Sequence, residues 1–331
     1  PERDDYSHGM VEASAVKNSI LAHQEFKNFA TRSLLPFKNW IPEAKFKEIK
    51  VGDNPKSFIF NISENLLNAY ANSELLSKYD IYQILKDYWA DTMQDDVYVL
   101  AQDDWQAGSA LRELVAQKGA KLKETPDLII NKKKFKAELI PPSLIVARYF
   151  ADEQAQVDAL QAKQDETTQT LESYLEEHAS SGTGSEDGLL AEALNDKDKI
   201  TKASVAARTK LATDIDEIKA LKQATKLYNA EAAAKKAVKE AQEALDLSVF
   251  NQYPKLDIDE IKTLIVDDKW LATLQANIIS EIERVIQQMA NRVKELEERY
   301  NAPLPTLTQL VDELSDKVAE HLKSMGLEWS L

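Results

Sequence analysis

The stretch Pro141-Pro-Ser-Leu-Ile-Val-Ala-Arg-Tyr-Phe150 separates two different kinds of sequence. Before it, aromatic and β-branched segments alternate with turns, which indicates a small α+β domain. After it, apolar residues recur every three or four positions, which predicts long amphipathic helices. Proline disfavours helix just upstream and serine caps free N–H groups, so we expect a helix to begin at Ser143 and to run to about His178.

This predicted helix has a heptad pattern. From Glu153 onward the seam positions alternate by four and three residues, which is coiled-coil spacing. The seam holds Val157, Leu160, Gln164, Thr167, Leu171 and Tyr174. Half of these residues are polar, so the helix should form a weak seam that needs a partner helix.

The rest of the C-terminal half continues the helical pattern. Ser180–Gly188 is rich in glycine and serine, which predicts a flexible break. No proline or glycine occurs between Leu189 and Tyr253, and Pro254 should end this arm. Two further apolar stripes flank the turn Asn301-Ala-Pro-Leu-Pro305, which predicts an antiparallel helical hairpin. Its candidate subunit-interface residues are Leu271, Ile278, Ile282, Val285, Met289, Leu296, Leu310, Leu314, Val318 and Met325.

The predicted fold class is mainly α, with a small α+β N-terminal domain and long helices in an antiparallel coiled-coil or helix-bundle arm. We divide the chain into a linker (1–15), the α+β domain (16–142), the arm (143–253, with the break at 180–188) and the terminal hairpin (254–331). Inside the α+β domain we expect a helix over Val16–Leu35 that is broken by Pro36 and Pro42, followed by a local core of Phe37, Trp40 and Ile41. We then expect a strand or helix entry over Ser57–Ile62 and helices over 64–77 and 80–93, the second with Asp80 as N-cap. The last predicted elements are a strand over Val97–Ala101, a short helix near 110–117 and a hairpin of 127–130 with 135–140.

Composition limits the classes of function. The chain has 331 residues, of which 44% are hydrophobic, so it can bury a substantial core. Its 41 basic and 56 acidic residues give a net charge of −15, which argues against a broadly nucleic-acid-coating or membrane-surface protein. It has no cysteine, so disulfides and thiolate sites are excluded. No apolar run approaches a membrane span, and a cytoplasmic location is the default expectation. The start at Pro1 suggests an excised fragment or a processed start.

Motifs that carry chemistry are weak. The glycines at 182, 184 and 188 follow no strand and lack the lysine of a phosphate loop, so we interpret them as a linker. Asp127 and Glu138 resemble a metal-dependent nuclease pair, but Glu138 lacks the lysine two residues later, which favours an ordinary hairpin. The pairs Asp95-Asp96, Asp103-Asp104 and Asp267-Asp268 fit solvated turns or helix starts better than a calcium loop. We therefore predict no catalytic, cofactor-binding or metal-ligating residue.

A basic cluster is the one candidate nucleic-acid contact. Lys132, Lys133, Lys134 and Lys136 lie on the predicted hairpin, with no acidic residue between Leu128 and Ala137. Lysines there can meet phosphates through counterion release. The favoured interpretation is a solvated turn whose lysines protect a sheet edge from pairing.

Several stretches resemble one family. They are Lys78-Tyr-Asp-Ile-Tyr82, Asp87-Tyr-Trp-Ala-Asp-Thr-Met-Gln-Asp-Asp-Val-Tyr98, Lys136-Ala-Glu-Leu-Ile-Pro-Pro-Ser-Leu-Ile-Val-Ala-Arg-Tyr-Phe150, Glu186-Asp-Gly-Leu-Leu-Ala-Glu-Ala-Leu194, Val266-Asp-Asp-Lys-Trp-Leu-Ala-Thr-Leu274 and Arg299-Tyr-Asn-Ala-Pro-Leu-Pro305. Together and in order, they are similar to the C-terminal region of the modification (DNA adenine-N6 methyltransferase) subunit of type I restriction–modification systems.

The resemblance implies adenine-N6 methylation of DNA with S-adenosylmethionine by the parent subunit, beside a specificity subunit and a restriction subunit. The glycine-rich cofactor motif and the Asn-Pro-Pro-aromatic motif of that family are both absent here, since Pro141-Pro142 follows Ile140. The resemblance thus implies a non-catalytic region that docks on the specificity subunit and helps to clamp DNA. Two alternatives stay open, namely a homo-oligomeric coiled-coil scaffold without a DNA role and a nuclease that uses Asp127 and Glu138.

Overall fold

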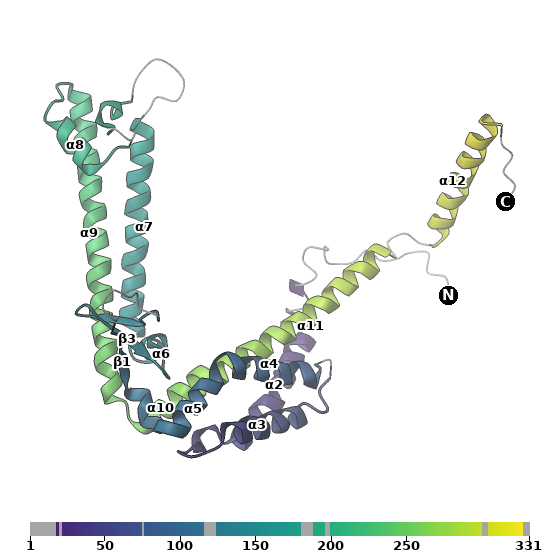
Figure 1. Cartoon of the computed structure of the whole chain (residues 1–331). Coiled ribbons are helices and arrows are strands. Elements are labelled where there is room, and N and C mark those ends of the chain that lie inside the picture. The colour runs from purple at the N-terminus through teal and green to yellow at the C-terminus, as the bar shows by residue number, and fades with distance from the viewer. Residues whose placement is uncertain are drawn as a thin grey trace. The chain divides into compact units, whose positions relative to one another are not determined.

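The computed structural model describes residues 18–19, 22–74, 76–115, 124–179, 188–195, 199–299 and 304–326. The chain is mainly helical with one small antiparallel sheet, which confirms the predicted fold class (Figure 1). Two compact units are present, unit 1 (1–102 with 270–331) and unit 2 (103–269). The predicted linker 1–15 and almost all of the predicted break at 180–188 lie outside the described residues.

These units divide the chain differently from the boundaries predicted at 142/143 and 253/254. The sheet belongs with the arm because Phe135 packs on Phe250 of the arm, with ring centroids 4.9 Å apart, and Tyr253 donates a 2.6 Å hydrogen bond to the Ile140 carbonyl. The last part of the chain returns to unit 1, where Trp270 and Leu274 are buried. Contacts between residues far apart in sequence thus decide the division.

Unit 1 is built from helices. They are α2 (Gln24–Ala44), η2 (Phe46–Glu48), α3 (Pro55–Ala69), α4 (Lys78–Tyr88), the π-helical η3 (Trp89–Met93), α5 (Gln94–Asp103, which ends one residue inside unit 2), α11 (Ala272–Arg299) and α12 (Leu304–Ser324). Aromatic side chains fill its core, and no buried side-chain nitrogen or oxygen among the described residues lacks a hydrogen-bond partner. The indole of Trp40 donates to the Ile62 carbonyl (2.9 Å), and the Tyr70 hydroxyl donates to the Ser33 carbonyl (3.0 Å).

The predicted break of the first helix at Pro36 and Pro42 is wrong. Helix α2 continues through both prolines and ends at Lys45, whose φ of 52° is left-handed. An interior proline costs a helix about 3 kcal/mol, since it removes a hydrogen bond and crowds the preceding turn. Burial of Phe37 and Trp40 on the same helix offsets that cost. It confirms these two residues of the predicted local core, whereas Ile41 is half-buried.

Two further expectations in unit 1 are corrected. Val97–Ala101 is not a strand but part of α5, where Val97 and Leu100 are buried on one helical face. Five apolar residues fit a buried helix as well as a strand, and packing decides between them. The N-cap of α4 is Ser77, whose hydroxyl accepts from the Tyr79 N–H, and Asp80 lies inside the first turn.

Unit 2 holds the sheet and the arm. Its elements are η4 (Trp105–Ser109), β1 (Leu111–Glu113), β2 (Leu128–Ile130), β3 (Lys133–Ala137), α6 (Pro142–Tyr149), α7 (Ala151–Ala179), η5 (Ala191–Ala193), α8 (Lys202–Thr209), α9 (Ile215–Gln252), η6 (Tyr253–Lys255), α10 (Ile258–Lys262) and the π-helical η7 (Thr263–Leu271), which runs into unit 1. The predicted hairpin is confirmed as β2 and β3, and Asn131 and Lys132 turn the chain with positive φ angles of 50° and 67°. The predicted helix near 110–117 is wrong for Leu111–Glu113, which pairs with β3 in the order β1-β3-β2.

The arm consists of α7 and α9 packed side by side, with α8 at one end (Figure 1). The predicted long helix is interrupted at Phe150, so α6 and α7 are separate, and α6 begins at Pro142 without a side-chain cap. The predicted seam positions of α7 are all buried or half-buried, whereas the residues around them are mostly exposed. The heptad pattern therefore identified the packed face, and α9 is its partner.

An apolar cluster closes the far end of the arm. It contains Leu190, Ala193, Val205, Ala220, Leu221 and Ala224, with Tyr174 and Tyr228 packed against it. Gly188 fits here because a Cβ at this position would lie 2.4 Å from the His178 carbonyl oxygen. No helix among the described residues is long and apolar enough to cross a membrane.

Candidate docking surface

The first half of α11 is part of the core of unit 1. Its buried residues recur every three or four positions and pack toward α2 and α4. They are Leu274, Ile278, Ile282, Ile286 and Ala290. Three predicted interface residues, Leu271, Ile278 and Ile282, are thus covered by this chain's own helices, and Val285 is half-buried. These positions belong to internal packing rather than to a free surface.

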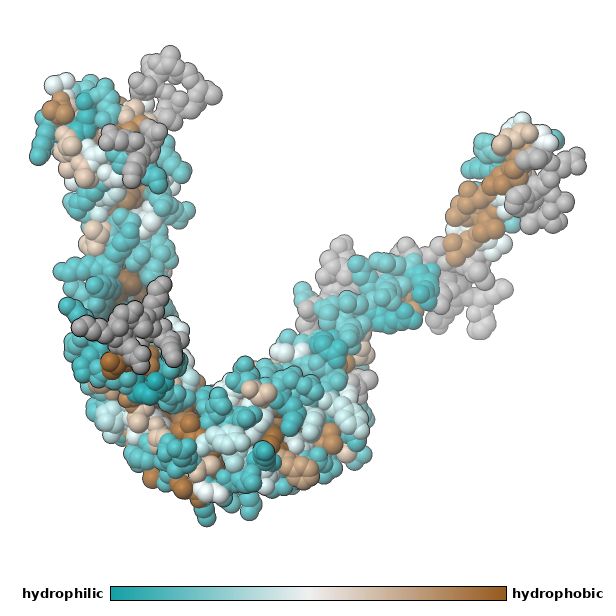
Figure 2. Space-filling view, in the orientation of Figure 1, coloured by the Kyte–Doolittle hydropathy of each residue, from teal (hydrophilic) through white to brown (hydrophobic). Residues whose placement is uncertain are grey.

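The exposed apolar residues begin where α11 leaves this core. Met289, Val293 and Leu296 of α11 are 36–48% exposed. On α12 the exposure rises further, and we call its exposed apolar residues the α12 stripe: Leu307, Leu310, Val311, Leu314, Val318 and Met325, at 40–73%. Figure 2 shows brown side chains along this helix. The predicted interface residues Met289, Leu296, Leu310, Leu314, Val318 and Met325 all lie in this exposed set.

Charges follow the opposite side of α12. Asp312, Glu313, Asp316 and Glu320 are exposed and are offset by roughly half a turn from the α12 stripe. The stripe residues share one face because their spacing is three or four. An amphipathic helix with an uncovered apolar face is a docking element for other helices. Since no described residue covers the stripe, the pairing of α11 with α12 into a hairpin stays a prediction.

Sequence reasoning missed Val311 as an interface residue. The spacing from Leu307 to Val311, Leu314 and Val318 is four, three and four residues, which is the same heptad rule that identified α7. Applying that rule to the last helix finds the residue without a structure.

The two carboxylates of the nuclease hypothesis each have a cationic partner. Asp127 accepts from Lys136 Nζ (2.8 Å) and from the Ala137 N–H (2.9 Å). Glu138 is ion-paired with Arg112, and the hydrogen bonds that Arg112 donates to Glu124 and Glu138 raise the pKa of its guanidinium. In the described part of the chain, no group of three metal-ligating side chains of the His, Cys, Asp or Glu type is arranged to hold a metal. The geometry is that of a sheet held by ion pairs.

The basic cluster is partly neutralised by its own sheet. Lys133 pairs with Glu113 (3.1 Å) and Lys136 with Asp127 (2.8 Å). The other two lysines, Lys132 and Lys134, form no ion pair with a described residue. The tertiary structure leaves these two as the hairpin's DNA-contact candidates.

The paired acids are structural, though not all are solvated as predicted. Asp96 is 4% exposed and accepts from the Trp270 indole N–H at 2.8 Å. Asp104 caps η4 by accepting from the Trp105 N–H, and Asp268 pairs with Arg148. Two histidines also have local roles: His23 caps α2, and His178 stacks on Tyr174.

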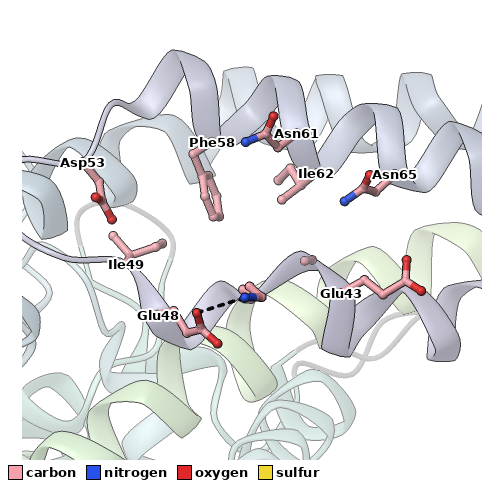
Figure 3. A pocket seen from close by; sticks show the side chains of 10 residues that line it. Glu43, Glu48, Ile49, Asp53, Phe58, Asn61, Ile62 and Asn65 are labelled. Carbon is pink, nitrogen blue, oxygen red and sulfur yellow. Dashed lines mark ion pairs between the residues drawn. The ribbon is translucent and has the colours of Figure 1, made fainter.

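A shallow groove of about 370 Å³ lies between α3 and the segment that joins α2 to η2 (Figure 3). Asn61 and Asn65 of α3 line one side, the carboxylates of Glu43 and Glu48 line the other, and Asp53 lies at one end. Lys45 is paired with Glu48 at 3.6 Å, and both side chains are about two-thirds exposed. These solvated groups lack a nucleophile–base pair, so the groove supports no specific reaction.

No protein-family model, no curated protein and no solved structure matches this chain.

Proposed function

We propose that this chain is the C-terminal assembly region of a type I restriction–modification DNA methyltransferase subunit. In this proposal it docks on helices of the specificity subunit and helps to clamp DNA for adenine-N6 methylation. The restriction subunit joins the assembled enzyme, and the parent subunit supplies S-adenosylmethionine chemistry elsewhere. The stretches that resemble this family motivate the assignment, and the exposed α12 stripe carries the docking part of it.

The energetics of the stripe fit an obligate contact. Full burial of a Leu, Val or Met side chain gives about 1.5–3 kcal/mol. The six stripe residues are 40–73% exposed, so docking gains about half of this for each, or roughly 5–9 kcal/mol in total, against an association cost of about 4–15 kcal/mol. Burial on one partner helix leaves little surplus, so a stable complex needs Met289, Val293 and Leu296 as well. The partner should present at least two helices.

The test mixes the chain with the specificity subunit and measures complex formation by size exclusion and calorimetry. Leu314→Asp with Val318→Asp should weaken binding at least 100-fold, because it buries charge in the contact. The control is Gln309→Asp, which adds one negative charge to the opposite, exposed face of α12. It should bind within about threefold of the parent chain.

Circular dichroism of each variant excludes loss of the helix as the cause. Absence of a complex at low salt would overturn the proposal. A stable dimer of the chain alone in analytical ultracentrifugation, lost in the Leu314→Asp/Val318→Asp variant, would favour the homo-oligomeric scaffold instead.

A further inference from the structure

Two segments at one end of the arm contain several basic residues and no acidic residue. Residues 199–213 contain Lys199, Lys202, Arg208 and Lys210 and no acidic residue. Residues 218–230 contain Lys219, Lys222 and Lys226, again with no acidic residue. These segments form α8, the turn after it and the first turns of α9. In a chain of net charge −15, this is a marked segregation of basic residues.

The three acids between the two segments are engaged locally. Asp214 caps α9 by accepting from the Asp216 and Glu217 N–H groups, both at 2.9 Å. Glu217 binds Arg208, with its Oε2 at 3.0 Å, and Asp216 pairs with Lys219 at 2.9 Å. These carboxylates therefore neutralise Arg208 and Lys219 and leave the other lysines uncompensated.

The two basic segments belong to one packed body. Val205 of α8 lies in the same buried cluster as Leu221 of α9, and the Tyr228 hydroxyl donates to the Ile200 carbonyl at 2.8 Å. The hydrogen bond to Glu217 raises the pKa of Arg208, which acts here as a bridge between α8 and α9. The lysines are thus displayed on a preformed scaffold.

We call Lys202, Lys210, Lys222 and Lys226 the tip lysines. All four are exposed, and none forms an ion pair with another described residue. Farther along α9 the pattern is different, because Lys235, Lys236 and Lys239 pair with Glu231, Glu240 and Glu243 at four-residue spacing. The same helix therefore has free lysines at one end and compensated lysines in its middle.

We propose that the tip lysines bind the phosphate backbone of duplex DNA. Lys222 and Lys226 are one turn apart, about 6 Å along the α9 axis. A duplex carries one negative charge per about 1.7 Å, so several phosphates lie within reach of this face. The contact is independent of base sequence because lysine meets phosphate as a point charge.

The choice of duplex DNA rests on the proposed function, whereas the basic surface itself does not. The two proposals fail separately, since docking is measured with the specificity subunit and without DNA. DNA binding is measured here on the chain alone.

The experiment measures fluorescence anisotropy of a labelled duplex of arbitrary sequence, from about 50 to 200 mM salt. Replacing the four tip lysines by Gln should weaken binding at least tenfold at the lower salt. It should also reduce the slope of log K against log salt by about three to four, since each phosphate contact contributes about 0.9. The control replaces Lys235, Lys236 and Lys239 by Gln and should change affinity by less than threefold.

A second variant, Lys132→Gln with Lys134→Gln, tests the hairpin in the same assay. Unchanged affinity and salt slope in the tip variant would overturn the proposal, as would absence of DNA binding by the parent chain. If the tip variant loses binding to vesicles of anionic phospholipid but keeps its DNA binding, the proposal is overturned, and the tip lysines bind a membrane surface instead. Equal thermal melts of all variants show that α8 and α9 stay folded.

Discussion

The first half of α11 and the whole of α12 have the same sequence pattern and opposite environments. Both place large apolar residues every three or four positions. On α11, Ile278 and Ile282 are 1% and 2% exposed, whereas Leu314 and Val318 on α12 are 50% and 44% exposed. Periodicity thus shows that a helix has an apolar face. It does not show whether the same chain covers that face.

The largest expected difference between these helices is in stability. Ile278→Ala should lower the free energy of unfolding by about 2–5 kcal/mol, because it leaves a cavity against α2 and α4. The matched change Leu314→Ala on α12 should alter it by less than about 0.5 kcal/mol. Urea unfolding of the chain alone measures both. A loss above 2 kcal/mol for Leu314→Ala would mean that α12 is packed within the chain.

A second prediction concerns Asp96 of α5, which binds Trp270 of η7, just before α11. Asp96→Ala removes the acceptor of the Trp270 indole N–H and should destabilise unit 1 by about 1–3 kcal/mol. The exposed neighbour Asp95→Ala loses only a favourable charge at the start of α5, and should cost less than about 1 kcal/mol. Chemical unfolding followed by tryptophan fluorescence compares them, and equal losses would contradict a specific role for Asp96.

The smallest expected effect is a pH dependence of the free energy of unfolding that comes from Tyr88, where α4 contacts α11. Burial raises the pKa of Tyr88 on α4 to about 12, and its hydroxyl is bonded to Thr273 of α11. An unfolded tyrosine has a pKa near 10. The neutral form is therefore favoured in the folded state, and its stabilising effect is present below pH 10 and is lost as the pH rises toward 12.

Tyr88→Phe should accordingly reduce the fall in the free energy of unfolding between pH 9 and pH 11. Tyr79→Phe is the control, since Tyr79 on the same helix is 65% exposed. If both variants show the same pH dependence, Tyr88 is not the group responsible.

Local sequence was sufficient where one short-range signal dominated. The β2–β3 hairpin followed from two apolar segments around Asn131-Lys132, and the seam of α7 followed from its heptads. It failed where two structures fit the same residues. The residues Val97–Ala101 fit a strand by pattern but form part of helix α5. Pro36 predicts the end of a helix, but α2 continues through it with Phe37 and Trp40 buried.

The sequence by itself determined the helical character of the chain, its apolar faces and its overall negative charge. These depend on residue type and spacing along one segment. Only the tertiary structure decided which apolar faces are covered and which lysines are compensated. Burial of Ile278 and pairing of Lys133 with Glu113 depend on residues far away in the chain, and no local pattern encodes those partners. For the same reason, the tertiary structure decides that the α12 stripe is exposed and that the tip lysines form no ion pair with a described residue.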